Sequence, residues 1–476
     1  MKKNSTKRSL LASVLALVMC VSMLVGTTFA WFTDTASTGV NKIQAGTLDV
    51  QLLDEDGTSL EGQTLSWKKA AGHENEAVLW EPGCTYNLQS FKIKNNGNLA
   101  LKYKIVISGI VGDAKLLEAI DFTVTGVDGV TTANALNGFE GKLAASSMTD
   151  AITISGHMKE SAGNEYQGKS IDGIGITVVA TQDTVEHDSN GNTYDERAEY
   201  PVLASSVSDF RDALSQGNST IILASDVTVD DGIQMEVKDD ASINFNGNTL
   251  RGSIISTGNT GDSPNNLVLR DTNNNGGYSI YSEIYEIENG HGQAAAIIAS
   301  LTTVTIESGK YTNDNAVILC QQYASNPNAV GVMINGGTFD GKGAASVIVN
   351  LSGNVIVNDG KFNAYHDGER YGTCVHLDHY IPNVPSITTI NGGTFNADKS
   401  IFYVNVDTNY IQKIIVTGGT FNVAEGGSLI EVSSGNASDY LTITGGTFNV
   451  DPTAYVDTNT HTVTDNGDGT WTVAEK

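Results

Sequence analysis

The stretch "ITGGTFNV", residues 443–450, decides the fold because related phrases recur through the C-terminal half of the chain. The other clear copies are "INGGTFDG" at 334–341, "INGGTFNA" at 390–397 and "VTGGTFNV" at 416–423, and weaker copies end at Tyr311 and Phe362. Successive aromatic residues of the six copies are 28, 23, 33, 26 and 27 residues apart. A unit of this length cannot bury its apolar side chains alone, so neighbouring units are expected to stack and share a core.

Two columns of mostly apolar residues precede the aromatic residue of each copy. One column holds Val304, Val332, Val355, Thr388, Ile414 and Leu441, and the other holds Ile306, Ile334, Val357, Ile390, Val416 and Ile443. A second strand follows each aromatic residue, as in "SVIVN" at 346–350 and "IFYVN" at 401–405. Short strands at this spacing, without hairpin symmetry, predict a right-handed parallel β-helix over 207–476, with rungs about 4.8 Å apart.

Each residue type of the phrase has a role in such a unit. Ile443 is expected to point inward, and Phe448 to stack beneath Phe421 in the core. Gly445 and Gly446 supply a bend that side chains would obstruct. The phrase therefore describes a scaffold, and function is expected in residues that do not repeat.

The two ends of this region are predicted to close the stack. After a linker at 198–206, "SVSDFRDALSQG" places Val207, Phe210 and Leu214 at helical spacing and predicts a cap helix. "THTVTDNGDGTWTV", residues 460–473, predicts a hairpin that covers the last edge. The region resembles the pectate-lyase-like superfamily of β-helices in architecture, which says little about chemistry.

Composition favours an all-β protein that is exported. Only 17% of residues are charged and 7 are Pro, whereas Gly reaches 51, a balance suited to short strands and glycine turns. A basic start, an apolar run at 10–26 and a small residue at Ala30 predict a secretory signal peptide over 1–30, cleaved before Trp31. An uncleaved membrane anchor is the alternative, but the apolar run is short for a span.

The charge of the expected mature chain narrows its partners. Removing residues 1–30 leaves 23 Lys plus Arg against 54 Asp plus Glu, a net charge of −31. Such a surface repels nucleic acid and anionic lipid and attracts divalent cations. Cys84, Cys320 and Cys374 would remain, too few and too scattered for a disulfide framework. With Cys320 and Cys374 two rungs apart, beyond the reach of a disulfide, both are predicted to be free thiols.

Residues 31–197 are predicted to form a separate β-sandwich. "FKIKNNGNLALKYKIVI", residues 91–107, alternates apolar and polar residues on both sides of an Asn-Gly turn, which predicts a β-hairpin. "IGITVVATQ", residues 174–182, predicts a further strand. The fold class is therefore all-β, with a sandwich followed by a β-helix.

The first two fifths of the chain contain four distinctive motifs: "TFAWFTD" at the cleavage point, "IQAGTLDV" after it, "EPG" followed by "IKNNGNLALKY", and "VVATQ". With these motifs the segment resembles the TasA/camelysin family of secreted bacterial matrix proteins. The resemblance implies a jelly-roll sandwich, cleavage by a SipW-type signal peptidase, and, for some members, assembly into extracellular fibres. The segment from Trp31 and Phe32 would then either insert into a neighbour's sheet or fold back as an edge strand.

The same family is also described as metallopeptidases, and the sequence argues against that activity. No HExxH motif occurs anywhere in the chain. His73 and His157 are isolated and are interpreted as surface histidines. Cys84 stands where a polar or acidic residue is common after "EPG", and it has no evident partner.

The densest group of chemically active residues is "YHDGERYGTCVHLDHY", 365–380, in the longest interval of the repeat. The strand within it is expected to place Cys374, His376 and Asp378 on the outer face. Asn350 and Tyr403 are expected beside them on the flanking strands. Three interpretations stay open: a metal or Ca²⁺ site, a carbohydrate-cleaving site with Arg370 as base and His376 and Asp378 beside it, and a polar binding or solvated face.

A second group resembles the start of a calcium loop. "DTNNNGG" provides Asp271, Asn273 and Asn275, but the closing acid Glu283 is one place later than an EF-hand requires. "DSNGNTYDE" at 188–196 is similar, and Asn-Gly turns explain both. No cofactor is expected, with Ca²⁺ as the alternative.

The sequence as a whole predicts a secreted cell-surface or biofilm-matrix protein with a structural or adhesive role. Its expected partners are extracellular glycans, other matrix proteins and copies of itself, with no membrane span after signal cleavage. The alternative is a polysaccharide-binding or polysaccharide-cleaving β-helix enzyme, a lyase or glycoside hydrolase, and a camelysin-type metallopeptidase ranks third.

Overall fold

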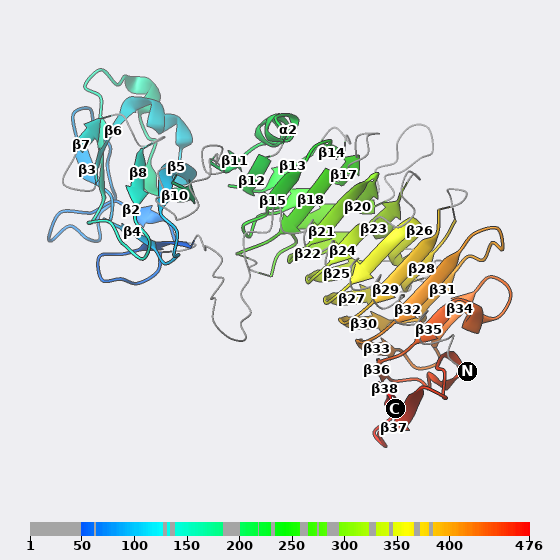
Figure 1. Ribbon diagram of the computed structural model, residues 1–476. Helices are drawn as coiled ribbons and strands as arrows, with labels where there is room; N and C mark the ends of the chain where they lie inside the picture. Colours follow the sequence, from blue (N-terminus) through cyan, green and yellow to red (C-terminus); the bar gives the residue numbers. More distant parts are fainter. Residues whose placement is uncertain are drawn as a thin grey trace. The chain divides into compact units, whose positions relative to one another are not determined.

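The chain divides into two compact units, Met1–Tyr200 and Pro201–Lys476. The computed structural model describes residues 49–60, 63–126, 131–133, 139–183, 200–217, 219–229, 234–257, 265–273, 276–282, 295–322, 330–341, 346–365, 372–379 and 384–476 (Figure 1). The described parts of both units consist mainly of β-strands, so the all-β prediction is confirmed. The jelly-roll topology of the first unit and the handedness of the second stay predictions.

The N-terminal unit is built from antiparallel strands. Its strands are β1 Val50–Leu53, β2 Leu65–Ser66, β3 Thr85–Asn87, β4 Lys92–Asn95, β5 Leu101–Gly112, β6 Ile120–Thr125, β7 Thr131–Ala133, β8 Glu140–Leu143, β9 Thr153–Met158 and β10 Ile171–Gln182. One sheet has the order β2-β10-β5-β8, a second has β3-β9-β6-β7, and β1 pairs with β4. The short 3-10 helices Ala114–Ala119 and Asn164–Tyr166 lie between strands. Alternate residues such as Phe91, Tyr103 and Ile105 are fully buried in one apolar core.

The predicted hairpin at 91–107 is wrong. β4 pairs with β1, whereas β5 pairs with β10 and β8, so the two predicted arms belong to different sheets. The Asn95 side chain holds the connection, because its amide donates to the carbonyls of Leu99 and Ala144 and its oxygen accepts from Gly97 N–H. The alternation of apolar residues identified the strands correctly, but it carries no information about which strands pair.

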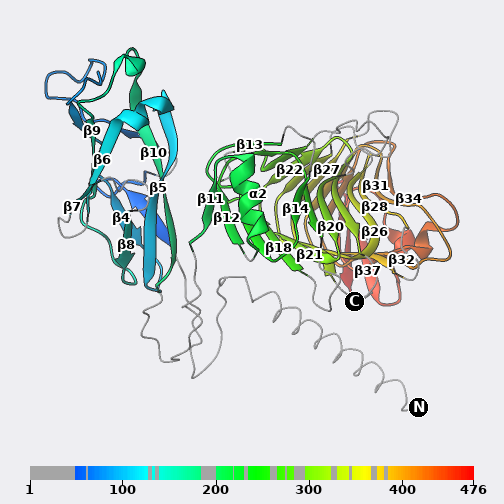
Figure 2. The ribbon, with the colours of Figure 1, turned by 90° about the horizontal axis from the view of Figure 1, so that it is seen from above.

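The C-terminal unit is a large parallel sheet that curls on itself, made of three ladders of strands (Figures 1 and 2). The first ladder holds β11 Val202–Ala204, β12 Ser219–Leu223, β15 Ala241–Asn244, β18 Asn265–Arg270, β21 Thr302–Ile306, β24 Val330–Ile334, β29 Ser386–Ile390, β32 Gln412–Val416 and β35 Leu441–Ile443. The second holds β13 Val227–Thr228, β16 Leu250–Arg251, β19 Ile280–Ser282, β22 Lys310–Asn313, β25 Thr338–Gly341, β27 Lys361–Ala364, β30 Thr394–Ala397, β33 Thr420–Val423 and β36 Gly446–Phe448. The third holds β14 Met235–Val237, β17 Ile254–Thr257, β20 Ala295–Ser300, β23 Ala316–Gln321, β28 Thr373–Leu377, β31 Ser400–Val404 and β34 Ser428–Val432.

The chain passes through the three ladders in turn, so most strands pair in parallel with the strand three places later, as β12 does with β15 and β30 with β33. The long strand β26, Ser346–Val357, runs through the third ladder and into the first. The two predicted columns hold: Val304, Val332 and Val355 are in register, and all are fully buried.

The aromatic residues of the repeated phrase form a continuous stack in the core. Tyr311, Phe339, Phe362, Phe395, Phe421 and Phe448 are each fully buried. Successive ring centroids are 5.3, 4.9, 4.5, 5.0 and 4.8 Å apart, and the ring planes lie within 14° of one another. This near-parallel stacking repeats the rung spacing and fills the centre of the unit.

The two glycines of the four clear copies serve different purposes, and the weaker copies keep only the second, as Gly309 and Gly360. A Cβ on the first glycine would meet a carbonyl oxygen of the preceding rung, 2.1 Å away at Gly445 and 2.4 Å away at Gly418. The second glycine has a positive φ, +114° at Gly446 and +108° at Gly419, which L-residues rarely adopt. The predicted bend is therefore a close backbone approach followed by a left-handed residue.

The ends of the C-terminal unit match their predictions. The helix α2, Val207–Ser215, begins at Ser206, whose hydroxyl accepts from Asp209 N–H, and it buries Phe210, Ala213 and Leu214 in the shared core. At the other end β37 His461–Asp465 and β38 Trp471–Glu475 form an antiparallel hairpin, and β38 pairs with β36.

The three described cysteines are free. Cys320 and Cys374 are both fully buried among core residues, and burial raises the pKa of the Cys320 thiol to about 12. The expected outward position of Cys374 is wrong. Thr373 pairs with Ser346, and Val375 pairs with Ile348. Cys374, between them, turns its thiol inward, toward the carbonyls of Phe362 and Asn396.

Candidate functional site

The candidate site lies where the third ladder ends, at the turns that follow β28 and β31. Leu377 pairs with Val404, so Asp378 and Asn405 occupy corresponding positions just past their strands. Ser433 follows β34 in the same register, since Val404 pairs with Val432. Backbone bonds continue past the strands, with Asp378 N–H donating to Asn350, Asn405 N–H to Leu377 and Ser433 N–H to Val404. Polar residues that follow these strands are therefore brought together at one edge.

His376 stands on the outer face of β28, within a column that is otherwise mostly apolar. The column continues through register pairs as Ile255, Ile298, Leu319, Val349, His376, Tyr403 and Glu431. His376 is only 8% exposed, and its ring packs edge-on against Tyr403 at 4.9 Å. Burial lowers the pKa of His376 below its ordinary value, although the Asp378 carboxylate, 3.8 Å from Nε2, opposes this shift.

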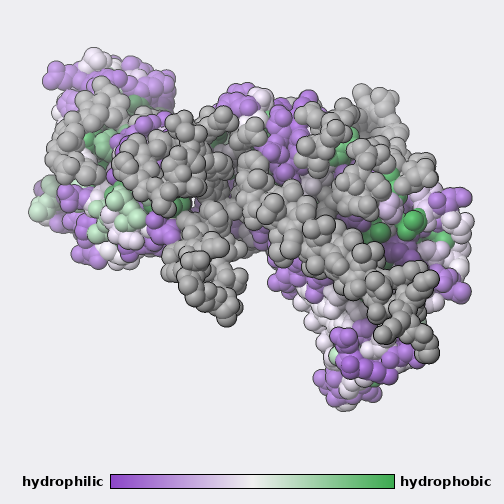
Figure 3. Space-filling view, in the orientation of Figure 1, coloured by the Kyte–Doolittle hydropathy of each residue, from purple (hydrophilic) through white to green (hydrophobic). Residues whose placement is uncertain are grey.

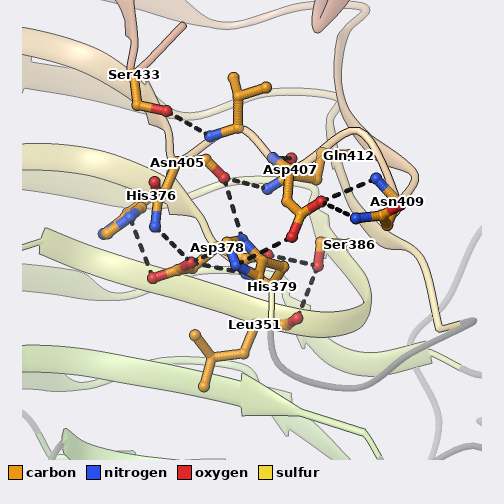
Figure 4. A network of polar contacts seen from close by, with 11 residues as sticks. Leu351, His376, Asp378, His379, Ser386, Asn405, Asp407, Asn409, Gln412 and Ser433 are labelled. Carbon is orange, nitrogen blue, oxygen red and sulfur yellow. Dashed lines mark hydrogen bonds and ion pairs between the residues drawn. The ribbon is translucent and has the colours of Figure 1, made fainter.

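Two carboxylates from neighbouring rungs converge on the imidazole of His379 (Figure 4). Its Nδ1 lies 3.3 Å from Asp378 Oδ1, and its Nε2 lies 3.6 Å from Asp407 Oδ2. The side chains of all three are 27–28% exposed, so the group is open to solvent. Tyr410 covers one side of the imidazole, with ring centroids 5.0 Å apart. We call Asp378, His379, Asp407 and Tyr410 the acid–imidazole cluster.

Side-chain amides hold the acid–imidazole cluster in place. Asn405 Nδ2 donates to Asp378 Oδ1 at 3.0 Å, and Asp407 Oδ1 accepts from both the backbone and the side-chain amide of Asn409. Gln412 is 2% exposed and bridges the turn, because it donates to Asn405 O and accepts from Asp407 N–H. The carboxylates therefore keep fixed directions, as general acid or base chemistry and ligand binding both require.

The structure divides the predicted site residues into three groups. His376 and Asp378 lie close together, as expected. Arg370, His366 and Glu369 fall outside the described residues. The expected position of Asn350 is wrong: it pairs with Leu377, is fully buried, and donates to Gly353 O and Ile387 O.

Asp407 was missed by the sequence reasoning. It lies two residues beyond the strand "IFYVN", outside the positions compared between neighbouring strands. The turn after β31 folds back to Gln412 and thereby brings Asp407 next to a histidine of the preceding rung. A comparison of the turn segments after each second strand would have paired "LDHY" with "VNVDTNY" and found it.

The calcium candidates lie in the turn between β18 and β19. Asp271 is 7% exposed, and its carboxylate accepts from Gly247 N–H and the Ser279 hydroxyl, each at 2.7 Å. Asn273 donates to Asn246 Oδ1, while Asn275 and Glu283 lie outside the described residues. Asp271 N–H also donates to the Ser308 hydroxyl, so Asp271 connects three successive rungs. No group of three or more His, Cys, Asp or Glu side chains suited to a metal ion occurs among the described residues.

The predicted cleavage point at Ala30 and Trp31 lies outside the described residues, as does "DSNGNTYDE". Within the described part of the chain, no helix has the length and apolar character needed to cross a membrane. His73 and His157, read from the sequence as surface residues, pair with Glu76 and with the Thr85 hydroxyl.

Away from the acid–imidazole cluster, the outer surface carries rows of side-chain amides. One row runs from Asp340 through Asn363 and Asn396 to Asn422, with successive bonds of 2.6, 2.9 and 2.9 Å. A second row contains Glu307, Asn335, Asn358, Asn391 and Thr417. In each row the amides donate toward the N-terminal end, where a carboxylate accepts the last bond. The coloured part of the face shown in Figure 3 is mostly hydrophilic or neutral, with scattered hydrophobic groups.

These features define an all-β protein with a repeated parallel scaffold and one irregular polar cluster. Residues 5–59 match the model of a family described as camelysin metallo-endopeptidase, a match that covers 55 of the 476 residues, about 12% of the chain. Among solved structures, the catalytic domain of a GH87 alpha-1,3-glucanase in complex with nigerose is 10% identical, with 84% of this chain and 98% of that chain covered. Its TM-score of 0.16 carries no argument about fold or function. No curated protein matches the chain significantly.

Proposed function

We propose that this chain is a secreted structural or adhesive protein of the cell surface or biofilm matrix. The observation that carries the proposal is the aromatic stack, in which the residue repeated in every unit is fully buried. The aromatic residue, the two aliphatic columns and the glycines of the repeat are core or bend residues, as expected of a rigid support built from stacked units. The family match at residues 5–59 and the predicted signal peptide support export.

The proposal includes the finer architecture. Residues 31–197 would form a TasA/camelysin-like jelly-roll, 198–206 a linker, and 207–476 a right-handed parallel β-helix with a cap helix and a closing hairpin. The parallel register between strands three places apart supports the β-helix. Cleavage between Ala30 and Trp31 by a SipW-type signal peptidase would free the segment that joins a neighbouring copy or folds back as an edge strand.

The proposed partners are extracellular glycans, other matrix proteins and further copies of the chain. The test is a glycan array probed with the full chain lacking residues 1–30, followed by analysis of each bound polymer for cleavage products. We expect binding without turnover. Turnover of any polymer that is lost in His376→Ala or Asp378→Asn would overturn the non-enzymatic role.

The second candidate is a polysaccharide-cleaving enzyme, a lyase or a glycoside hydrolase. It is favoured by the convergence of Asp378 and Asp407 on His379, since paired carboxylates are the usual acid and base of glycoside hydrolysis. Arg370 is the candidate base of a lyase. Reducing-end and unsaturated-product assays on the polymers bound in the array distinguish the hydrolase from the lyase.

The third candidate is the peptidase activity that the family description names. The sequence has no HExxH motif, which leaves this activity without its usual zinc ligands and general base. Calcium remains a proposed cofactor at Asp271, Asn273 and Asn275. Calcium titration of the full chain, followed by calorimetry, would detect it, and an unchanged melting temperature with excess calcium would argue against it.

A further inference from the structure

Among the described residues, no lysine or arginine pairs with the two carboxylates of the acid–imidazole cluster. Asp378 and Asp407 each keep about a quarter of their side-chain surface exposed. In the part of the chain that the structure describes, the ionic partners of these two carboxylates are the rings of His376 and His379 alone. Lys399 on the same ladder pairs with Glu431, and Lys413 donates to the carbonyl of Asp439. A cationic ligand would therefore find two oriented, accessible carboxylates here.

The same place offers a platform for a ring-shaped ligand. Tyr410 is half-buried and lies against His379 with its ring tilted by 36°. Ile411, the next residue, is 63% exposed and adds apolar surface there. An aromatic ring flanked by fixed carboxylates and by the amides of Asn405 and Asn409 combines an apolar contact surface with directed polar groups, as small binding sites do.

The charge of the whole chain favours the same kind of ligand. The net charge is −27, so an anionic polymer is repelled at long range and a cationic one is attracted. At the acid–imidazole cluster a polyuronate would bring its carboxylates against Asp378 and Asp407, which penalises binding through like-charge contact. For a neutral glycan, the charges of the carboxylates would neither weaken nor strengthen binding.

We propose that the acid–imidazole cluster binds a glycan that carries free amino groups, such as a polymer of glucosamine. The ammonium groups bind Asp378 and Asp407, and a sugar ring packs on Tyr410. Ligands of this class are selected over acetylated and uronic-acid glycans by charge. The inference rests on the glycan partner of the proposed function and specifies its chemical class.

The test compares hexamers of glucosamine, N-acetylglucosamine and galacturonic acid by calorimetric titration of the full chain lacking residues 1–30. We expect the glucosamine hexamer to bind at least about tenfold more tightly than the acetylated hexamer, with no binding of the galacturonic acid hexamer. Asp407→Asn should weaken glucosamine binding by about tenfold and leave acetylated binding unchanged. Tyr410→Ala, which removes the platform without changing charge, should weaken both hexamers alike.

Glu425→Gln is the matched control, because Glu425 is an exposed acid away from the acid–imidazole cluster. If Glu425→Gln weakens glucosamine binding as much as Asp407→Asn, the attraction is non-specific and the proposed site is wrong. Equal affinity for the amino and acetylated hexamers also overturns it. If the chain binds matrix polymers on the array but does not prefer glucosamine, this inference is wrong and the proposed function is unaffected. Absence of binding to every glycan and protein partner removes both.

Discussion

The repeated rungs and the 365–412 region of the C-terminal unit are built from the same kind of strand, but their side chains have different roles. In the rungs around Phe395, Phe421 and Phe448, the repeated aromatic and aliphatic side chains are buried and the glycines form a bend, while repeated Asn and Thr side chains face outward. In the 365–412 region the strands keep their register, but the turns after them lengthen and collect two aspartates and a histidine. Units of regular length thus build the scaffold, and the longer turns carry the chemically active residues.

The largest effect is expected from Phe395→Ala, in the middle of the aromatic stack. Its ring contacts Phe362 and Phe421 and is fully buried. Removing it leaves a cavity, so the free energy of unfolding of the C-terminal unit should fall by about 3–5 kcal/mol. Urea unfolding followed by circular dichroism measures this change. Tyr365→Ala removes an aromatic side chain that is 48% exposed and serves as the control, with an expected change below about 1 kcal/mol.

The glycine bend should respond to a single methyl group. A Cβ at residue 445 would lie 2.1 Å from Thr417 O, so Gly445→Ala forces two rungs apart and should cost about 2–3 kcal/mol. At Gly435 there is open space and a φ of +79°, and Gly435→Ala should cost only about 1–2 kcal/mol from backbone strain. The two melting curves separate steric contact from backbone strain. Equal losses would show that carbonyl approach does not explain the first glycine.

The amide rows should contribute less than the core. Asn396 donates to Asn363 and accepts from Asn422, so Asn396→Ala leaves two half-buried amides each short of one partner. We expect a loss of about 1–2 kcal/mol in unfolding free energy. Asn409→Ala, at an exposed turn, should change it by less than half as much. A neutral result at Asn396 would mean that water replaces the row without cost.

The smallest effect is a dependence of stability on pH from His376. Its pKa in the folded chain lies below the ordinary value of 6.5, because burial disfavours the charged ring. At pH values between the folded-state pKa and the ordinary pKa, the unfolded chain binds more protons than the folded chain. The contribution of His376 to the free energy of unfolding is therefore complete above the ordinary pKa and is lost as pH falls toward the folded-state pKa. His376→Gln should flatten the acid side of the stability profile relative to the unaltered protein. Parallel profiles would show that His376 is not responsible.

The sequence predicted the regular features well because each follows from a local rule. Phe448, Ile443 and the glycines of "ITGGTFNV" repeat, and repetition in register leaves one set of inward positions. The cap helix was predicted from Val207, Phe210 and Leu214, which form an apolar stripe at helical spacing within a few residues. Such signals need no knowledge of distant parts of the chain.

The wrong or missed predictions share one cause. The pairing of a strand, or the position of a side chain, depends on residues that are distant in the sequence. Asn95 lies where the chain passes from one sheet to another, and its side-chain amide donates to the carbonyl of Ala144. Nothing near Asn95 in the sequence indicates this hydrogen bond. Cys374 turns inward because two consecutive residues enter the core at this point of the rung, as Val347 and Ile348 do in the preceding one, and strict alternation does not predict this. Asp407 joins the acid–imidazole cluster through the fold of a turn whose bounds the repeat does not determine.

The central claim is that the repeat is a scaffold and that binding resides in residues that do not repeat. The most direct test measures adhesion of two variants to the matrix glycan found on the array. Thr394→Ala, Thr420→Ala and Thr447→Ala together strip one outward position from three consecutive rungs, and Asp378→Asn with Asp407→Asn alters the acid–imidazole cluster. The account predicts full adhesion for the threonine variant and its loss for the aspartate variant. Loss of adhesion in the threonine variant, with the aspartate variant unaffected, would contradict it.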